Sequence, residues 1–123
     1  MILADTSVWV DHLRAGNARL ARLLEDGEVV SHPFVVGELA LGNLRQRDTV
    51  LDALSGLPQA NVATHTEVLH LVREEALFGR GIGYVDAHLL ASTRLSPGTL
   101  LWTRDRRLRE VAAWLGLAIG EER

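Results

Sequence analysis

Residues 2–7 read Ile2-Leu3-Ala4-Asp5-Thr6-Ser7, a short apolar run that stops at three polar residues. Such an apolar run is typical of a buried strand. Asp, Thr and Ser are the residue types that most often cap the first turn of a helix. The segment therefore predicts a strand over residues 2–4 that runs directly into a helix, with a carboxylate at the junction.

The rest of the chain repeats this alternation of short apolar runs and helical patterns. The expected strands cover residues 2–4, 28–31, 61–63, 99–103 and 117–119, of which 61–63 is the weakest. The expected helices cover residues 8–14, 18–26, 33–44, 49–55, 66–78, 85–95 and 106–115. This order predicts an α/β fold in which helices cover both faces of a parallel sheet. At 123 residues, we expect a single domain over residues 1–123.

The composition excludes several kinds of chemistry. The chain has no cysteine, and all 13 of its basic residues are arginine. Disulfides, thiolate metal sites, cysteine nucleophiles and lysine-dependent phosphate loops are therefore excluded. The missing lysine also argues against a phosphotransfer receiver domain, and Ser7, two residues after Asp5, argues against a haloacid-dehalogenase-like phosphatase.

We expect a cytoplasmic protein with no membrane partner. No apolar run is long enough to span a bilayer, and the N-terminus does not resemble a secretory signal. The formal net charge of −3 argues weakly against a nucleic-acid partner, but it becomes +1 once four carboxylates are neutralised by cations. Four arginines also fall within residues 104–109, and we expect some to face RNA and at least two to be solvated.

Four acidic residues on four separate elements are the candidate site. They are Asp5, Glu38, Asp86 and Asp105. Each of the three Asp residues has a simpler explanation, because an Asp near a helix start commonly caps that helix. Glu38 lies in an otherwise uncharged helical stretch, where we expect burial, which would require a partner or a metal; an exposed helix position is the alternative. As a set near one sheet edge, the four favour Mg²⁺ or Mn²⁺, since no zinc-like histidine or cysteine pattern exists.

These residues lie in four segments that resemble the PIN domain, most closely the VapC toxins of bacterial toxin–antitoxin pairs. The segments are Ile2-Leu3-Ala4-Asp5-Thr6-Ser7, Val36-Gly37-Glu38-Leu39, Gly83-Tyr84-Val85-Asp86-Ala87-His88-Leu89-Leu90-Ala91 and Leu101-Trp102-Thr103-Arg104-Asp105-Arg106-Arg107-Leu108. Each motif alone is weak, but the four occur in the family's order over nearly the whole chain. The acidic position matched by Asp105 varies most within the family.

The resemblance implies a three-layer α/β/α fold with a short, mainly parallel sheet and an endoribonuclease that depends on Mg²⁺ or Mn²⁺. Asp5, Glu38 and Asp86 would hold one metal, and Asp105 would complete that site or a second. Thr6, Ser7 or Thr103 would orient water or a ligand. Cleavage would leave a 5′-phosphate and a 3′-hydroxyl. The implied partners are an RNA substrate, a second copy of the chain and a VapB-like antitoxin, in a heterotetramer or larger assembly.

Some alternatives stay open at this point. A non-catalytic PIN-like module that binds RNA or a partner would share the fold without needing four acidic groups. We interpret His88 and the other histidines as structural. We interpret Trp9, Trp102 and Trp114 as core or dimer contacts rather than platforms for RNA bases. The RNA target is not predicted.

Overall fold

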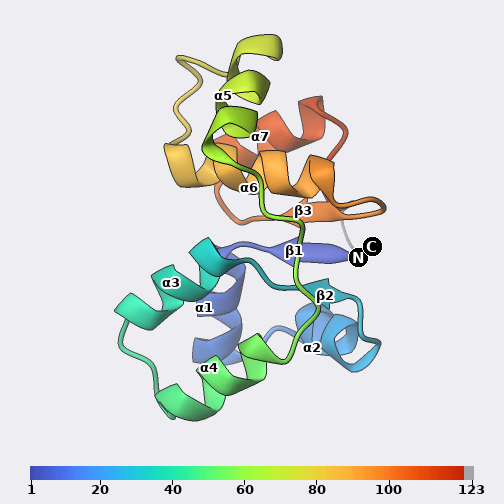
Figure 1. The fold of residues 1–123 in the computed structure, drawn as a ribbon. Helices are drawn as coiled ribbons and strands as arrows, with labels where there is room; N and C mark the ends of the chain where they lie inside the picture. Colours follow the sequence, from blue (N-terminus) through green and yellow to red (C-terminus); the bar gives the residue numbers. More distant parts are fainter. Residues whose placement is uncertain (121–123) are drawn as a thin grey trace.

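The computed structural model of this chain describes residues 1–120, so the predicted domain end at residue 123 lies outside the described part. A three-stranded sheet in the order β2-β1-β3 forms its centre. β1 (Ile2–Ala4) pairs in parallel with β2 (Val29–Val30) on one side and with β3 (Leu100–Trp102) on the other. The carboxyl ends of the strands therefore meet at one edge of the sheet, on the left in Figure 1.

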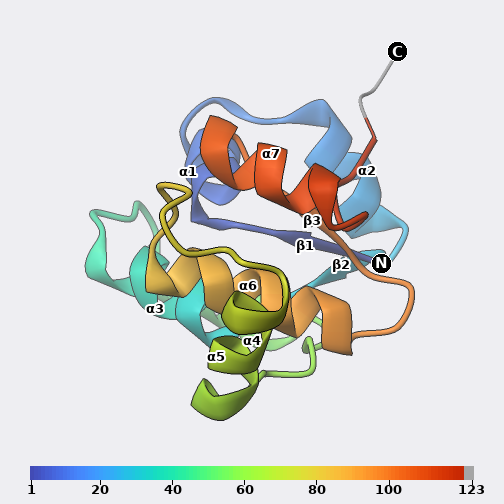
Figure 2. The same cartoon turned by 90° about the horizontal axis from the view of Figure 1, so that it is seen from above.

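Helices fill the intervals between the strands. They are α1 (Thr6–Ala15), α2 (Ala18–Glu25), α3 (Pro33–Leu41), α4 (Arg47–Ser55), α5 (His65–Glu74), α6 (Tyr84–Leu95) and α7 (Arg106–Trp114). Figure 2 shows α1, α2 and α7 on one side of the sheet and the other four helices on the opposite side. The predicted three-layer α/β/α fold is confirmed.

The sheet and α6 form the centre of the hydrophobic core. All three residues of β1 are buried, and so is every residue of α6 from 87 to 93. A helix buried to this extent fixes its own first turn firmly against the sheet edge. That first turn contains Asp86.

The strand predicted over residues 61–63 is wrong. The backbone N–H of Asn61 donates to Ser96 Oγ at 2.9 Å, and that of Ala63 donates to Ser92 Oγ at 3.0 Å. Hydroxyl groups on α6 and at its C-cap thus take the place of a neighbouring strand as acceptors. The strand expected over 117–119 is reduced to a single parallel bridge between Leu101 and Ala118.

Two helices end earlier than the apolar pattern predicts. α3 ends at Leu41, not at residue 44, because Gly42 takes an extended conformation with φ −86° and ψ 176°. α5 ends at Glu74, not at residue 78, and Ala76 follows with a left-handed φ of 51°. The remaining predicted helices lie within a few residues of the observed ones.

Candidate active site

Asp5 lies where β1 turns into α1, and both of its carboxylate oxygens are hydrogen-bonded. Oδ1 accepts from the Val8 backbone N–H at 3.2 Å and from Ser7 Oγ at 2.5 Å. Oδ2 accepts from Thr103 Oγ1 at 2.5 Å. The residue is only 6% exposed, so these donors replace much of the hydration that a charged group requires. A carboxylate has about four lone-pair sites, so these three bonds leave one, on Oδ2, for a further partner.

Thr103 connects the ends of β1 and β3. Its buried hydroxyl donates to Asp5 and accepts from the backbone N–H of Asp105 at 3.0 Å. Ser7 makes a parallel link, because its Oγ accepts from the Arg104 backbone N–H at 3.0 Å. Two hydroxyl groups therefore hold the loop after β3 against the first turn of α1.

The capping interpretation is confirmed for Asp5 and Asp105, which are the N-caps of α1 and α7. Asp105 Oδ1 accepts from the Leu108 backbone N–H at 2.9 Å. Asp86 lies in the first turn of α6, where its Oδ2 accepts from the Gly83 N–H at 3.2 Å. Capping uses only part of each carboxylate, so it does not compete with a second role for the same groups.

Glu38 projects from α3, and the expectation that it is buried is wrong. Val35 and Leu39 turn the buried face of α3 toward the core, while Glu38 is exposed. Its Oε1 accepts from Thr6 Oγ1 at 2.6 Å, which ties α3 to the start of α1. The Glu38 carboxylate thus lies at the surface with one oxygen positioned by a hydroxyl.

Electrostatics connects the four acidic groups. Burial raises the pKa of the Asp86 carboxyl above its ordinary value, against the Gly83 N–H, which lowers it. Like-charge repulsion from three further groups raises it again; these groups are Asp105, Asp5 and Glu38. The structure therefore places Asp5, Glu38 and Asp105 close enough to Asp86 for each to act on its charge.

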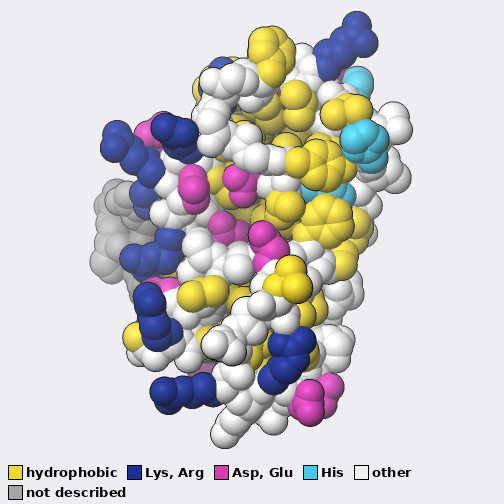
Figure 3. Space-filling view, turned by 90° about the vertical axis from the view of Figure 1, so that its left-hand side faces the viewer, with side chains coloured by type: hydrophobic (Ala, Val, Ile, Leu, Met, Phe, Trp, Pro, Cys, Tyr) yellow, Lys and Arg dark blue, Asp and Glu magenta, His cyan; other side chains and the backbone are white. Residues whose placement is uncertain are grey.

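The face over this edge has an uneven distribution of charge. Figure 3 shows acidic side chains gathered near its centre, with arginines mainly along one side and hydrophobic and histidine side chains along the other. An acidic centre repels a phosphate unless cations neutralise it. The positively charged arginines at its margin attract a phosphate.

Comparison with known proteins adds an independent observation. The model of the PIN domain family matches residues 2–113. The chain belongs to the PIN domain family. It is also 57% identical over 122 residues to Ribonuclease VapC32 of Mycobacterium tuberculosis strain CDC 1551 / Oshkosh, covering 99% of this chain and 98% of the relative. The relative of the same name from strain ATCC 25618 / H37Rv gives the same figures. The resemblance inferred from the four motifs is confirmed.

The donor set of this PIN domain fits a hard divalent cation, since all four groups are carboxylates. As the side chains stand, no group of three or more His, Asp or Glu residues within the described part is arranged to hold a metal ion. Mg²⁺ commonly uses one or two carboxylates and retains several waters, so it does not require a closed protein cage. Mutual repulsion at Asp86 is the observation that favours a counter-charge here.

Three of the four arginines that follow the last carboxylate have a contact within the protein, yet all four are exposed, as we expected of at least two. Arg104 pairs with Asp11 at 3.0 Å, and Arg106 pairs with Glu110 at 3.2 Å. Arg107 lies directly against Gly81. Sequence reasoning did not select Asp11, for which the only signal was an acidic charge on the first helix.

The histidines of the PIN domain interior form a structural cluster, as we expected of His88. His32 is fully buried, caps α3 through Nδ1 and contacts Ser92 Oγ through Nε2 at 2.9 Å. Burial lowers the pKa of His32 to about 4, with a further contribution from His88. The cluster links the start of α3 to α6, and these two helices carry Glu38 and Asp86.

The tryptophans differ in their surroundings. Trp9 is buried in the core, and Trp102 is partly buried and packs against the core. Trp114 is 56% exposed, and the Arg80 guanidinium lies 4.4 Å from its ring centroid. Trp114 is therefore not a core residue, and its alternative role as a dimer contact stays a prediction.

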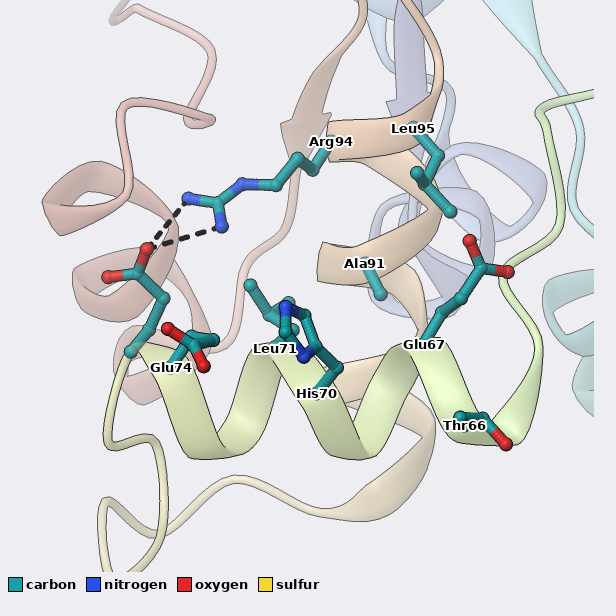
Figure 4. Close-up of a pocket in the computed structure, with 9 residues that line it drawn as sticks. Thr66, Glu67, His70, Leu71, Glu74, Ala91, Arg94 and Leu95 are labelled. Carbon is teal, nitrogen blue, oxygen red and sulfur yellow. Dashed lines mark hydrogen bonds and ion pairs between the residues drawn. The ribbon is translucent and has the colours of Figure 1, made fainter.

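A groove of about 510 Å³ lies between α5 and α6, away from the carboxylates. Figure 4 shows His70 and Leu71 of α5 facing this groove, with Arg94 of α6 on its far side. None of the four acidic candidates lines it, so we assign it no part in the chemistry. Within residues 1–120, no helix has the length and apolar character needed to cross a membrane.

Proposed function

We propose that this PIN domain is an endoribonuclease dependent on Mg²⁺ or Mn²⁺, acting as the toxin of a VapBC-type pair. The observation that carries the proposal is the electrostatic convergence of Asp105, Asp5 and Glu38 on Asp86. Burial and these neighbouring carboxylates raise the pKa of Asp86, and perturbed pKa values concentrate at functional sites. The 57% identity to a protein named as a ribonuclease supports the same activity.

Asp5, Glu38 and Asp86 are the residues that would hold a cation, with Asp105 completing that site or a second. A divalent cation supplies the positive charge and the activated water that phosphodiester hydrolysis needs at neutral pH. The fixed position of Asp5, at the end of the central strand, makes it the reference point of the set. Glu38 and Asp86 approach from helices on the opposite side of the sheet from α1.

The small hydroxyl residues orient these carboxylates. Thr6 donates to Glu38, while Ser7 and Thr103 donate to Asp5. Each donor fixes one lone-pair direction of its carboxylate. Asp5, which also accepts from the Val8 N–H, keeps one lone-pair site on Oδ2 for a ligand, whereas Glu38 keeps more. Groups of this kind set ligand geometry in metal sites, and they are nearly as important as the ligands themselves.

The partners follow from the same proposal. RNA is the substrate, and a VapB-like antitoxin is the inhibitor, with a homodimer of this chain as the core of a heterotetramer or larger complex. Both partners would meet the protein in the cytoplasm. Cleavage leaves a 5′-phosphate and a 3′-hydroxyl.

The proposal is tested by cleavage of RNA in Mg²⁺ and in Mn²⁺ by wild type, Asp86→Asn and Asp48→Asn. Asp48 is the matched control, because it also lies in the first turn of a helix, α4, but is not among the groups that act on Asp86. We expect Asp86→Asn to lose at least about 100-fold in rate, since removing even the partners of ligands costs 10- to 100-fold. Asp48→Asn should cleave as wild type does.

A folded Asp86→Asn or Asp5→Asn protein that cuts RNA at the wild-type rate would refute this scheme. Retained RNA binding with neither cleavage nor Mn²⁺ binding in the wild type would instead identify a non-catalytic module. Mapping the 5′ and 3′ ends of the products tests the predicted hydrolysis directly. A 2′,3′-cyclic phosphate would exclude attack by water.

A further inference from the structure

A small cavity with a positive lining opens next to the carboxylates. It has a volume of about 300 Å³ and lies beside the end of β3. Arg19, Trp102, Thr103 and Arg109 are among the residues that line it. Two of the described lining residues are arginines and none is acidic, so the cavity selects for an anion.

Thr103 places this cavity next to Asp5 of the candidate active site. The same residue that lines the cavity donates its hydroxyl to Asp5 Oδ2. An anion in the cavity would therefore lie near Asp5, one of the groups that would hold the cation at the reacting phosphate. In an RNA strand, the anion nearest to the scissile phosphate is a neighbouring backbone phosphate.

Arg109 differs from the other arginines of its segment. Arg104 and Arg106 each form an ion pair, and Arg107 packs on Gly81. Arg109 makes no ion pair or side-chain hydrogen bond with the described residues, and it lines the cavity. Its five N–H donors are thus available to a ligand.

Arg19 is fixed on the other side of the cavity. Its guanidinium carbon lies 5.3 Å from the centroid of the Trp102 ring, and its Nη2 donates to the Gly120 carbonyl at 2.7 Å. Stacking and this single bond hold the planar group in one place while leaving most of its donors unused. A guanidinium held in this way loses little entropy when an anion binds.

We propose that Arg109 and Arg19 form a subsite for a backbone phosphate of the RNA strand, next to the phosphate that is cleaved. The subsite rests on the proposed function for the identity of its ligand, but its test does not depend on cleavage. Arg109 is the main phosphate contact, and Arg19 is a preformed second donor. Phosphate contacts of this kind fix the register of the strand and do not read its sequence.

Fluorescence anisotropy with a labelled single-stranded oligoribonucleotide tests the subsite in an Asp5→Asn background with Mg²⁺, where the strand stays intact. Arg109→Gln and Arg106→Gln are compared, because both remove one positive charge from α7 and only Arg109 lines the cavity. We expect Arg109→Gln to raise Kd about 10-fold and to reduce the salt dependence of binding by about one phosphate contact. Arg106→Gln should change Kd by less than about twofold.

A single neutral methylphosphonate linkage, moved along the oligonucleotide, locates the contact. At one position, it should weaken binding of the parent protein clearly more than that of the Arg109→Gln variant, which keeps only the Arg19 contact. In steady-state cleavage by the enzyme with Asp5 intact, Arg109→Gln should raise KM and leave kcat unchanged, because the contact is made equally in substrate and transition state.

The outcomes separate this proposal from the function on which it rests. Equal losses for Arg109→Gln and Arg106→Gln, or no loss for either, overturn the subsite while wild-type cleavage preserves the proposed function. A selective loss for Arg109→Gln in a protein whose wild type cuts no RNA supports the subsite and overturns the nuclease. No RNA binding by the parent protein overturns the subsite, and the cavity would then suit an acidic segment of a protein partner; wild-type cleavage decides the proposed function separately.

Discussion

Replacing Thr103 by valine tests the link between the strand ends and the carboxylates. The side chain is 4% exposed, and its hydroxyl donates to the charged Asp5 and accepts from the Asp105 N–H. Valine keeps the shape and removes only the hydroxyl. The change therefore isolates one hydrogen-bonding group from the packing of β3.

The magnitude follows from the partners. A hydrogen bond to a charged group contributes about 1.5–3 kcal/mol to the free energy of unfolding. In the variant, the Asp105 N–H can form a hydrogen bond with water instead. We expect Thr103→Val to lower the free energy of unfolding by about 2.5 kcal/mol. For a chain of this length, that is a fall in Tm of roughly 10 °C. Affinity for Mn²⁺ should fall 10- to 100-fold, because Asp5 loses the donor that orients Oδ2.

Thermal unfolding by circular dichroism in EDTA, and calorimetric titration with Mn²⁺, measure the two effects. Thr103→Ser is the control, because it keeps the hydroxyl and loses one methyl group, which costs about 1 kcal/mol. It should bind Mn²⁺ as wild type does. The reasoning fails if Thr103→Val melts and binds Mn²⁺ like wild type, or if Thr103→Ser loses as much affinity as Thr103→Val.

Three further predictions follow from the charges and the backbone. Asp86→Asn should raise Tm in EDTA by a few degrees and abolish the stabilisation by Mn²⁺, because a carboxyl with a raised pKa costs stability once the pH exceeds its ordinary value; a lower Tm in EDTA contradicts this. His32, with its pKa lowered to about 4, should contribute stability that is complete above pH 6.5 and is lost as the pH falls toward 4, by at most about 3 kcal/mol. Urea unfolding against pH measures the loss, and an NMR titration of His32 near 6.5 would exclude it. Gly81→Ala should destabilise by about 1–2 kcal/mol, because φ is +78° and the new Cβ meets Arg107, whereas Gly37→Ala in the open interior of α3 should stabilise by about 0.5–1 kcal/mol. If the urea midpoints of the two variants shift in the same direction, these opposite effects of the two glycines are wrong.

Local signals in the sequence were sufficient for the sheet edge and its carboxylates. An apolar run followed by Asp predicts a buried strand and then a helix cap. Asp5 and Asp105 each come after a strand and cap the helix that follows it. The four motifs lie in one family order, so the resemblance carried the layered fold as well. What these signals share is short range, since each depends on residues within a few positions of one another.

Long-range contacts explain what the sequence did not reveal. Residues 61–63 have a strand-like composition, but their N–H groups bond to hydroxyls about 30 residues away on α6. Glu38 has apolar neighbours in sequence, yet it faces outward, where its carboxylate accepts a hydrogen bond from Thr6, 32 residues earlier. Arg104 and Arg106 form ion pairs with acidic residues in the fold, whereas Arg109 does not and so can contact a ligand. No periodicity in one chain encodes such pairings.

The double role of the Asp residues decides how the active site must be tested. Asp5 caps α1 and is also a proposed ligand, so Asp5→Ala would remove both functions and confuse lost folding with lost chemistry. Asparagine is as good an N-cap as aspartate and keeps an oxygen for the Val8 N–H. Its amide group can face Thr103, whose hydroxyl oxygen can accept a bond and rotate its own hydrogen away. Asp5→Asn should therefore retain the wild-type secondary structure while losing cleavage, and an unfolded Asp5→Asn protein would show that the charge itself, and not the cap, holds the end of β1.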